Sequence, residues 1–533
     1  MQITAVTPPL HNQLVEDYWT KGSTLQSFFS YAYEEAAFTE RLAYLQNQHY
    51  EREQLAAIMR ESMSVYPLSA TTEQHLTQLA NGAFAIVGGQ QSGVFTGPLY
   101  SVHKAITVIQ LARKQSVALG VPVVPVFWIA GEDHDIEEIN HTFTYTKDGL
   151  HKRKYKDRFI EKTMASTTEV TEEKLQQLID AVIADYGEQT YTKEVIAQLR
   201  AAAKVSTTFT AFFTYLMHGL FNDAGLLWVD AANPKLRKLE SAYFIRLIES
   251  APAIAKVVTM QEERLQQAGY GTPIFATTEA ANLFYVKNGA RHLLTQQDGV
   301  FTTGEDTFTK AQLVDIATAH PEQLSNNVVT RPLMQEMVLP VLAFVGGPGE
   351  LAYWATLKPA FDEMDLQMPI FAPRLHITLV TPHVQKQLQA LQLTIEQVFA
   401  GEHHKKREAF IASVQPTEVL DTLATTKQAL QANYATLLQQ MPEALLTITQ
   451  KNQELHLRQF DYLQRKVEQD TLIKHEVALA KYAVLDYELL PDGGLQERTY
   501  NPYQYIASCG ADWINALCQQ NLQTSYKHYV VSL

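Results

Sequence analysis

The stretch that decides the fold is residues 84–104, which read FAIVGGQQSGVFTGPLYSVHK. It begins with an apolar run typical of a buried strand and continues through a double glycine into a Thr-Gly-Pro helix start. Gly88 and Gly89 would let a ligand approach the main chain, and a helix from Pro98 would direct free N–H groups toward it. The pattern predicts an anion-binding turn, although a tight strand-to-helix turn without a ligand fits it as well. Neither G-x-G-x-x-G nor G-x-x-x-x-G-K-[ST] is present.

The composition indicates a folded protein with more than one domain. The chain has 533 residues, of which 46% are hydrophobic and 19% are charged, and this balance excludes a disordered chain. The net charge of −14 argues against nucleic acid or an anionic membrane as a partner. Two local basic runs, HKRKYK (151–156) and HHKKR (403–407), are expected to be solvated surfaces.

The N-terminus and the cysteines indicate a cytoplasmic protein. The first residues lack the basic and apolar regions of a secretory signal, and no apolar stretch approaches the roughly 20 residues of a membrane span. Cys509 and Cys518 are nine residues apart, a spacing of neither a zinc pair nor a redox C-x-x-C. We expect two free thiols, a reducing compartment and no cysteine metal site.

Five short apolar runs predict a parallel sheet within residues 1–382. Each lacks the alternation of apolar and polar residues, which indicates burial on both faces. Helical patterns between them complete a doubly wound α/β core, and residues 1–80 form a helical N-terminal region of it. The runs are FAIV (84–87), VPVVPVFWIA (121–130), LLWV (226–229), LPVLAFV (339–345) and MPIFA (368–372).

Two insertions interrupt the predicted core. Residues of about 137–221 form a mixed, largely helical stretch, and residues of about 261–321 carry hairpin chemistry. In the second, Asn288-Gly289 and Asp298-Gly299 are strong tight-turn dipeptides between apolar runs. Such insertions can supply substrate contacts or have a purely structural role.

Residues 383–490 have the pattern of an antiparallel coiled-coil arm. A first helix begins at Pro416-Thr417 and ends at Pro442, and a second is expected from Glu443 to Leu485. The narrow apolar stripe favours dimerisation through the arm over a monomeric hairpin. Residues 491–533 are expected to pack back on the core. The seam residues are Leu420, Leu423, Lys427, Leu430, Tyr434, Leu437 and Met441 in the first helix, and Phe460, Leu463 and Val467 in the second.

The residues that follow the strands predict one composite pocket, because ligands of parallel sheets bind at the carboxyl ends of the strands. Each of the five apolar runs is followed by glycines or polar side chains. In strand order these are Gly88, Gly89, Gln90, Gln91, Ser92, Gly93, Thr96 and Gly97; Gly131, Glu132, Asp133, His134 and Asp135; Asp230 and Asn233; Gly346, Gly347, Pro348, Gly349 and Glu350; and Arg374 and His376.

The cluster GEDHD (131–135) allows three interpretations. Asp133, His134 and Asp135 are suitable metal ligands, but neighbours on an extended segment point to opposite sides, so we expect no metal there. Asp133 or Asp135 could bind a ribose hydroxyl or a substrate ammonium, with His134 as proton carrier. The cluster could also be a polar helix cap.

The segment SNNVVTRP (325–332) adds further candidates. Arg331 is a planar donor fork suited to a carboxylate or phosphate, and Asn326 and Asn327 could surround a polar ligand. Lys104, one turn into the first core helix, is a further anion partner. The chain has no G-x-S-x-G, no H-E-x-x-H and no kinase motif set, which removes the common hydrolase and kinase classes.

Taken in order, seven strings in the chain resemble the bacillithiol biosynthesis family, whose members are named cysteine ligases. The resemblance covers essentially the whole chain. It implies a cytoplasmic bacterial homodimer that adds cysteine to glucosaminyl malate, the last step of bacillithiol synthesis. It also implies a Rossmann-like core related to class I nucleotidyltransferases, with two connecting insertions and a coiled-coil dimerisation arm. The strings are GGQQSGVFTGPLYSVHK, VPVFWIAGEDHDIEEIN, FNDAGLLWVD, ANLFY, LSNNVVTRPLMQE, LAFVGGPGELAYW and HYVVSL.

This reaction joins a carboxylate to an amine and expels water, so the carboxylate needs activation. We expect ATP with Mg²⁺ as cosubstrate and no nucleic acid or membrane partner. The H-x-G-H and K-M-S-K-S signatures of class I synthetases are absent, which leaves adenylate and acyl-phosphate both open. The alternatives are a nucleotide-binding scaffold or sensor without turnover, and a metal-dependent transferase centred on GEDHD.

The expected roles follow from the charges. Backbone N–H groups of Gly88-Gly89 and Thr96-Gly97 would hold a nucleotide phosphate or the malyl carboxylate, while Lys104 and Arg331 offset negative charge. Gly347, Gly349, Glu350 and Arg374 complete the binding wall. In the GEDHD cluster, an aspartate would hold an ammonium or a sugar hydroxyl, and His134 would take the proton from the attacking amine.

Overall fold

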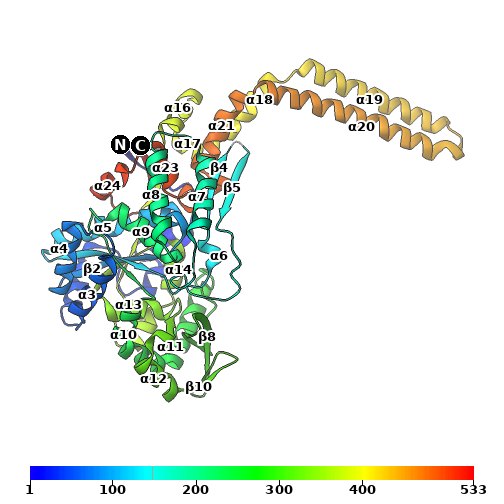
Figure 1. The fold of residues 1–533 in the computed structure, drawn as a ribbon. Coiled ribbons are helices and arrows are strands. Elements are labelled where there is room, and N and C mark those ends of the chain that lie inside the picture. The colour runs from blue at the N-terminus through cyan, green and yellow to red at the C-terminus, as the bar shows by residue number, and fades with distance from the viewer. Residues whose placement is uncertain (147) are drawn as a thin grey trace. The chain divides into compact units, whose positions relative to one another are not determined.

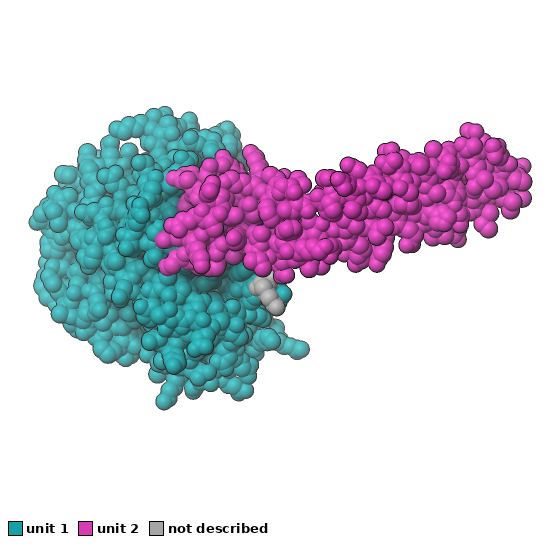
Figure 2. Space-filling model, turned by 90° about the horizontal axis from the view of Figure 1, so that it is seen from above, with its two compact units in different colours: residues 1–381, 494–533 teal, residues 382–493 magenta. Residues whose placement is uncertain are grey.

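We describe a computed structural model that covers residues 1–146 and 148–533. The chain forms two compact units, the first from residues 1–381 and 494–533 and the second from residues 382–493. Figure 1 labels the elements, and Figure 2 shows the first unit in teal and the second in magenta. The C-terminal residues therefore complete the first unit, and the second unit is inserted into it.

A five-stranded, all-parallel sheet forms the centre of the first unit (Figure 1). Every residue of its middle strands is buried apart from Gln90 at one strand end, which explains why the apolar runs show no alternation. The predicted parallel sheet is confirmed. Its order is β13 (Ile370–Pro373), β12 (Val341–Gly346), β2 (Phe84–Gln90), β3 (Val123–Ile129) and β6 (Leu227–Asp230).

Helices pack against this sheet and supply most of its hydrophobic cover. The long helix α5 (Leu99–Leu119) follows β2 and contacts β2, β3 and β12, and it begins directly after Pro98, as the sequence predicts. The helical N-terminal region packs on the sheet through α2, α3 and α4. Its elements are α1 (Gln13–Trp19), η1 (Thr24–Phe28), α2 (Glu35–Leu45), α3 (Arg52–Met63) and α4 (Ala70–Ala80).

The double glycine of β2 allows close packing inside the sheet. A Cβ atom on Gly89 would lie 2.5 Å from the Trp128 carbonyl oxygen, and one on Gly88 would lie 2.8 Å from a Val108 methyl group and 3.2 Å from Lys104 Cγ. The 2.5 and 2.8 Å distances are shorter than those that real Cβ atoms show, and the 3.2 Å distance is tight. The two glycines therefore bring β3 and α5 against the end of β2.

The chain leaves the sheet between β3 and β6, where the sequence predicts a largely helical stretch. Besides the helices, it forms an antiparallel hairpin of β4 (His141–Thr146) and β5 (Gly149–Lys154). Phe213 packs its ring against Phe127 of the sheet, with centroids 6.2 Å apart. The helices are α6 (Ile136–Ile139), α7 (Glu172–Tyr186), α8 (Thr192–Val205) and α9 (Phe209–Phe221).

A second sheet forms between β6 and β12. The predicted turns are confirmed, because Asn288 and Gly289, with φ of 53° and 81°, join β7 to β8, and Asp298-Gly299 joins β8 to β9. Its strand order is β10 (Thr307–Thr309), β9 (Val300–Thr302), β8 (Ala290–Gln297), β7 (Ala280–Lys287) and β11 (Leu324–Asn326). Neighbouring helices are α10 (Pro234–Leu239), α11 (Ser241–Gln267), α12 (Lys310–Ala319), η3 (Pro321–Gln323), α13 (Thr330–Val338), α14 (Pro348–Trp354) and α15 (Lys358–Glu363).

The two chain ends meet in a third sheet. The last strand, β15 (His528–Ser532), pairs antiparallel with β1 (Gln2–Val6) and parallel with β14 (His376–Val380). Before it come α22 (Gln496–Thr499), α23 (Tyr503–Cys509) and α24 (Asp512–Cys518). The C-terminal segment thus packs in the first unit, where Cys518 is buried and Cys509 is partly buried, both as free thiols.

The second unit is helical throughout its elements. In it α19 (Thr417–Gln440) and α20 (Glu443–Lys474) run side by side (Figure 1). The predicted second helix to Leu485 is wrong in one respect: His475, at φ −111° and ψ 16°, ends α20 and separates it from α21 (Glu476–Leu489). No Gly or Pro marks this break. The other elements are α16 (Pro382–Leu391), α17 (Ile395–Phe399), α18 (Glu402–Val414) and η4 (Pro491–Gly493).

The arm buries little of its apolar seam within one chain. Tyr434 is buried and its hydroxyl contacts Asn452 and His456, but Leu437 is 38% exposed and Leu463 is 48% exposed. In the part of the chain that the structure describes, no helix is long and apolar enough to cross a membrane.

We predict that Gly89→Ala destabilises the protein by about 1–3 kcal/mol, because its methyl group would overlap a backbone oxygen of β3. Gly349→Ala is the control, since nothing lies within 4 Å of its Cβ position. Urea denaturation of both variants measures the difference. Equal midpoints for Gly89→Ala and the unchanged protein would contradict the packing role.

Candidate active site

A cavity of about 820 Å³ lies at the carboxyl ends of the parallel strands. This is where the sequence predicts a composite pocket, and most of the predicted residues line it. Those lining residues are Gly89, Gln90, Gln91, Lys104, Asp133, His134, Asn326, Asn327, Arg331, Gly347, Gly349, Glu350 and Arg374. Glu132 and Pro348, from the turns that follow two of the predicted strands, also line it. The sequence did not single out the others, namely Tyr100, Trp128, Ala130, Glu138, Phe284, Arg291, Val328, Tyr353 and Arg498.

Lys104 is a buried cation whose contacts are all internal. Its Nζ donates to the Gly89 carbonyl (2.6 Å), to Gln90 Oε1 (2.9 Å) and to Glu350 Oε2 (2.7 Å). An ammonium group has three protons, so these three acceptors use all of them. Burial lowers the pKa of Lys104, and the Glu350 carboxylate opposes that effect. Lys104 therefore holds the cavity wall together, and no proton is left for the predicted contact to a bound anion.

Glu350 connects this cation to the second glycine-rich turn. Its Oε2 also accepts from the Gly347 backbone N–H at 2.8 Å, which closes the first turn of α14. On the same helix, Tyr353 accepts a 2.7 Å hydrogen bond from Arg331 Nη2. Among the described residues, no carboxylate lies within ion-pair distance of Arg331. Its remaining N–H groups can therefore serve a ligand.

Asp133 presents a carboxylate at the cavity. Its Oδ2 accepts from Gln91 Nε2 at 2.6 Å, and its Oδ1 accepts from the His134 backbone N–H at 2.7 Å. Gln91 Nε2 also donates to Glu138 at 2.8 Å. The side chain of Asp133 is 32% exposed, so it combines a fixed orientation with access to a ligand. A cationic ammonium is the group that such a site favours.

Arg291 fixes the protonation state of His134. Its Nη1 lies 3.0 Å from His134 Nδ1, and its guanidinium stacks on Phe284 with 3.9 Å to the ring centroid. A guanidinium can only donate, so Nδ1 is the acceptor and Nε2 carries the proton of the neutral ring. Burial, followed by the positive charge of Arg291, lowers the pKa of His134. The neutral ring then has no free lone pair, which opposes its predicted role as proton acceptor.

A buried ion-pair network joins the two loops that carry these groups. Glu132 accepts from Arg237, from Ser325 Oγ at 2.8 Å and from the Asn326 N–H at 3.1 Å. Arg237 also donates to Glu240 at 2.7 Å. Burial raises the pKa of Glu240 to about 7, although Arg237 lowers it. The network thereby fixes the GEDHD turn against β11.

Asn326 offers an unpartnered amide to the cavity. It is 2% exposed, and neither its Oδ1 nor its Nδ2 has a hydrogen-bond partner among the described residues. Trp128 Nε1 is buried and unpartnered in the same way. Buried polar atoms without partners are costly, so a ligand or water is expected to satisfy them. Asn327 differs, because its Oδ1 accepts from the backbone N–H groups of Val329 and Thr330 at the start of α13.

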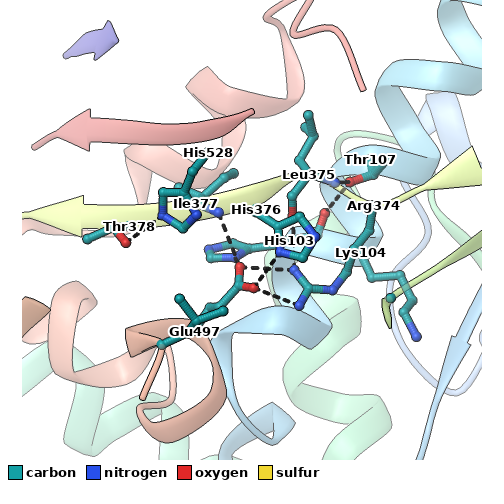
Figure 3. Close-up of polar contacts among 12 residues, drawn as sticks. His103, Lys104, Thr107, Arg374, Leu375, His376, Ile377, Thr378, Glu497 and His528 are labelled. Carbon is teal, nitrogen blue, oxygen red and sulfur yellow. Dashed lines mark hydrogen bonds and ion pairs between the residues drawn. The ribbon is translucent and has the colours of Figure 1, made fainter. Parts of the chain in front are cut away.

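The C-terminal segment completes the cavity. Arg374 and Arg498 both lie over the Tyr100 ring, with 5.7 and 5.9 Å from guanidinium carbon to ring centroid. Arg374 is 4% exposed and pairs with Glu497 (Figure 3). Arg498 is exposed and has no ion-pair partner among the described residues. Two guanidinium groups, those of Arg331 and Arg498, are thus free to meet an anionic ligand.

Eleven residues of the predicted pocket do not line the cavity, namely Gly88, Ser92, Gly93, Thr96, Gly97, Gly131, Asp135, Asp230, Asn233, Gly346 and His376. The loop after β2 turns inward because Phe95 packs in the core against Phe212 and Tyr503. Within it, Ser92 Oγ bonds Thr210 at 2.9 Å and the Gly97 N–H donates to Val94 at 2.9 Å.

The backbone cradle predicted around the double glycine does not form. Gly88 pairs with Val345 and Phe127 inside the parallel sheet, so its main chain serves the strand ladder. Asp135 is exposed and precedes α6 without a side-chain cap bond. The three side chains of the GEDHD cluster therefore do not converge, and a transferase metal site centred on them lacks its ligand set.

The missed residues come from segments where local sequence gives little signal. Arg291 lies on an alternating β strand, where an arginine usually faces solvent, and Arg498 lies in the C-terminal segment. Tyr100 is four residues before Lys104, a spacing that places both on one helix face. Of these three residues, only Tyr100 lies in the quoted stretch 84–104, where its spacing from Lys104 could have identified it. Among the described residues, the one group of clustered possible metal ligands is His403, His404 and Asp486 in the second unit.

Comparison with known proteins matches the whole chain to one family. Residues 1–375 match Bacillithiol biosynthesis BshC, N-terminal Rossmann-like domain, and residues 377–533 match its C-terminal coiled-coil domain. The chain belongs to the BshC family. The family boundary differs from the compact units, because residues 494–533 fold with the Rossmann-like part.

Curated relatives cover this chain almost completely. A protein of Lysinibacillus sphaericus is 49% identical over 538 residues, with 100% of both chains covered. Proteins of Bacillus cytotoxicus and Geobacillus kaustophilus are 35% and 37% identical, with 100% and 97% of both chains covered. All three carry the name "Putative cysteine ligase BshC". The resemblance stated from the sequence is confirmed.

We predict that His134 is neutral at pH 7 with its proton on Nε2. Its lowered pKa means that the ring charges only as pH falls below the ordinary value of 6.5. In Arg291→Met the nearby cation is gone while Asp133 remains, so the pKa of His134 should rise. Nitrogen-15 NMR of the imidazole ring measures the pKa and shows which nitrogen carries the proton. The His134→Asn variant identifies the His134 signals. Arg264→Met is the control, and a proton on Nδ1 at pH 7 would contradict the assignment.

Proposed function

We propose that this protein joins L-cysteine to glucosaminyl malate through an amide bond, the last step of bacillithiol biosynthesis. The observation that carries the proposal is the cavity, which presents the free guanidinium groups of Arg331 and Arg498 together with the accessible carboxylate of Asp133. The substrates carry the matching groups, since glucosaminyl malate has carboxylates and an amine, and cysteine has an ammonium. The names of the BshC relatives support the same activity.

The anionic groups of the substrates bind to the guanidinium groups of Arg331 and Arg498. Arg331 is held by Tyr353 and Arg498 lies over Tyr100, so each fork is oriented yet retains donors. Charge-assisted hydrogen bonds from guanidinium to carboxylate or phosphate are strong and directional. The malyl carboxylates and a nucleotide phosphate share this chemistry.

The substrate amine binds at the negatively charged carboxylate of Asp133. Peptide-type bond formation needs the substrate amine in its neutral form, so a proton must leave its ammonium before or during attack. Asp133 can accept that proton, because its carboxylate is fixed by Gln91 and remains accessible. His134 acts as an Nε2–H donor toward a substrate oxygen. This replaces the proton-accepting role that the sequence predicts for His134.

ATP supplies the activation in this proposal. Forming the amide from a free carboxylate expels water, and an adenylate or an acyl-phosphate turns that oxygen into a leaving group. The residues fit an anionic cosubstrate at Arg331 and Arg498, but the backbone cradle predicted around Gly88-Gly89 does not serve it. Glu138, which accepts from Gln91, is an accessible carboxylate for Mg²⁺. The protein acts in the cytoplasm, where ATP and reduced cysteine are present.

The arm forms a homodimer. Apolar side chains of α19 and α20 stay exposed within one chain, among them Val419, Leu445, Leu455 and Leu463, each between 46% and 49% exposed. A second copy would bury this stripe, as in other antiparallel helical hairpins that associate.

The activity test incubates the protein with cysteine, glucosaminyl malate and Mg-ATP and follows products by mass spectrometry. We expect bacillithiol with stoichiometric AMP or ADP, which distinguishes an adenylate from an acyl-phosphate. Arg331→Met should raise KM for glucosaminyl malate by about tenfold or more, because a charge-assisted contact is lost. Arg200→Met, on the exposed surface of α8, is the control. Nucleotide binding without any product would favour the scaffold interpretation instead.

The dimer test is sedimentation equilibrium of the protein and of Leu455→Glu/Leu463→Glu. We expect a dimer that this double charge substitution converts to a monomer, while Gln464→Glu, a polar position beside them, leaves the dimer intact. A monomeric unchanged protein at micromolar concentration would refute the interface.

A further inference from the structure

The short helix α22 (Gln496–Thr499) is attached to the core by the side chain of Gln496 and by the main chain of the residue that follows it. Gln496 accepts from the Leu379 N–H at 2.8 Å and donates to the Leu379 carbonyl at 2.9 Å, as a neighbouring strand would. After the helix, the Tyr500 carbonyl accepts from the Leu99 N–H at 2.7 Å, the first residue of α5. The segment is therefore held between β14 and α5, and it carries Arg498 at the cavity.

Glu497 is the centre of a buried polar cluster (Figure 3), of which Arg374 also lines the cavity. Its carboxylate is fully buried and accepts two hydrogen bonds from Arg374, at 2.7 and 2.9 Å. It also accepts from Nδ1 of His376 at 2.9 Å, Nδ1 of His103 at 3.1 Å and the Ile377 N–H at 3.1 Å. The carboxylate thus joins α5, β14 and the segment that follows β13.

The carboxylate of Glu497 has Arg374 as its principal counter-charge. Burial would raise the pKa of Glu497, but Arg374 and His376 outweigh it and hold the pKa well below its usual range. Burial lowers the pKa of His103 and lowers that of His528 to about 3. At neutral pH the carboxylate is therefore ionised, and the guanidinium of Arg374 supplies its counter-charge.

The ion pair with Glu497 also fixes the orientation of the Arg374 guanidinium. The bidentate pair fixes the plane of the guanidinium, a third donor goes to the Leu375 carbonyl at 3.0 Å, and the Tyr100 ring lies beside it. Its Nε lies 3.2 Å from the Cβ position of Gly347, so a larger residue there would displace it. Nε has no acceptor among the described residues. Without Glu497, the guanidinium could turn toward Glu350 across the wall.

We propose that Glu497 is a positioning residue that holds Arg374 at the cavity wall for an anionic group of the substrate. Together with Arg498, it makes α22 a part of the binding site that the Rossmann-like domain alone does not contain. The identity of the anion, the malyl dicarboxylate, rests on the proposed function. The positioning itself rests on the contacts of Glu497 and Arg374.

The test measures binding of glucosaminyl malate and of L-malate by titration calorimetry, without turnover. Glu497→Gln keeps the shape and removes the charge, and Arg374→Met removes the positioned group. We expect each to raise the Kd for both ligands by about tenfold or more, and the double variant to bind no more weakly than either single one. Glu336→Gln is the control, because it also breaks a fully buried Glu–Arg pair, with Arg41, outside the cavity lining.

The outcomes separate the two proposals. Additive losses, an unchanged Kd in Glu497→Gln, or equal losses in Glu336→Gln would show a merely structural role and overturn the positioning. Failure of the unchanged protein to bind either ligand would overturn it as well. Binding that behaves as expected, together with no bacillithiol in the activity assay, would leave the positioning intact and refute the ligase proposal alone.

Discussion

The cavity depends on the buried ammonium of Lys104. Its three hydrogen bonds connect the end of β2 to the first turn of α14, and they form only because glycine at 88 and 89 lets α5 and β3 approach so closely. Glu350 neutralises the cation and at the same time caps α14 at Gly347. One interaction thus sets the spacing of both glycine-rich turns, and the remaining site groups are arranged around it.

Internal pairing divides the charged residues of the site into two classes. Lys104 and Glu132 are buried and have fixed partners of opposite charge, so they shape the wall. Arg374 is also buried and paired, with Glu497, but its Nε has no acceptor among the described residues and remains for a ligand. Arg331 and Arg498 have no ion-pair partner among the described residues, and Asp133, 3.7 Å from Arg291 Nη1, still has an accessible carboxylate; all three line the cavity. This division gives the site opposite charges at separate places, which suits substrates that carry both carboxylates and an amine.

The sequence predicts the sheet well, because strands buried on both faces leave uninterrupted apolar runs, and it predicts the site edge from the polar residues that follow them. The sequence does not predict the features that tertiary packing determines. Phe95 and Thr96 adopt φ of 54° and 70°, which no local pattern indicates, and this turns the loop away from the cavity. Arg291 reaches His134 across 157 positions of sequence, a contact set only by the tertiary fold. The break at His475 likewise has no marker in the sequence.

The central claim is that free guanidinium groups, and not Lys104 or the double glycine, receive the anionic substrate. A crystal structure of the protein with glucosaminyl malate tests it most directly. We expect a malyl carboxylate within hydrogen-bonding distance of Arg331, Arg374 or Arg498, with Lys104 still bonded to Gly89, Gln90 and Glu350. A malyl group bound by Lys104, by the amides of residues 88–97, or outside the cavity would contradict it.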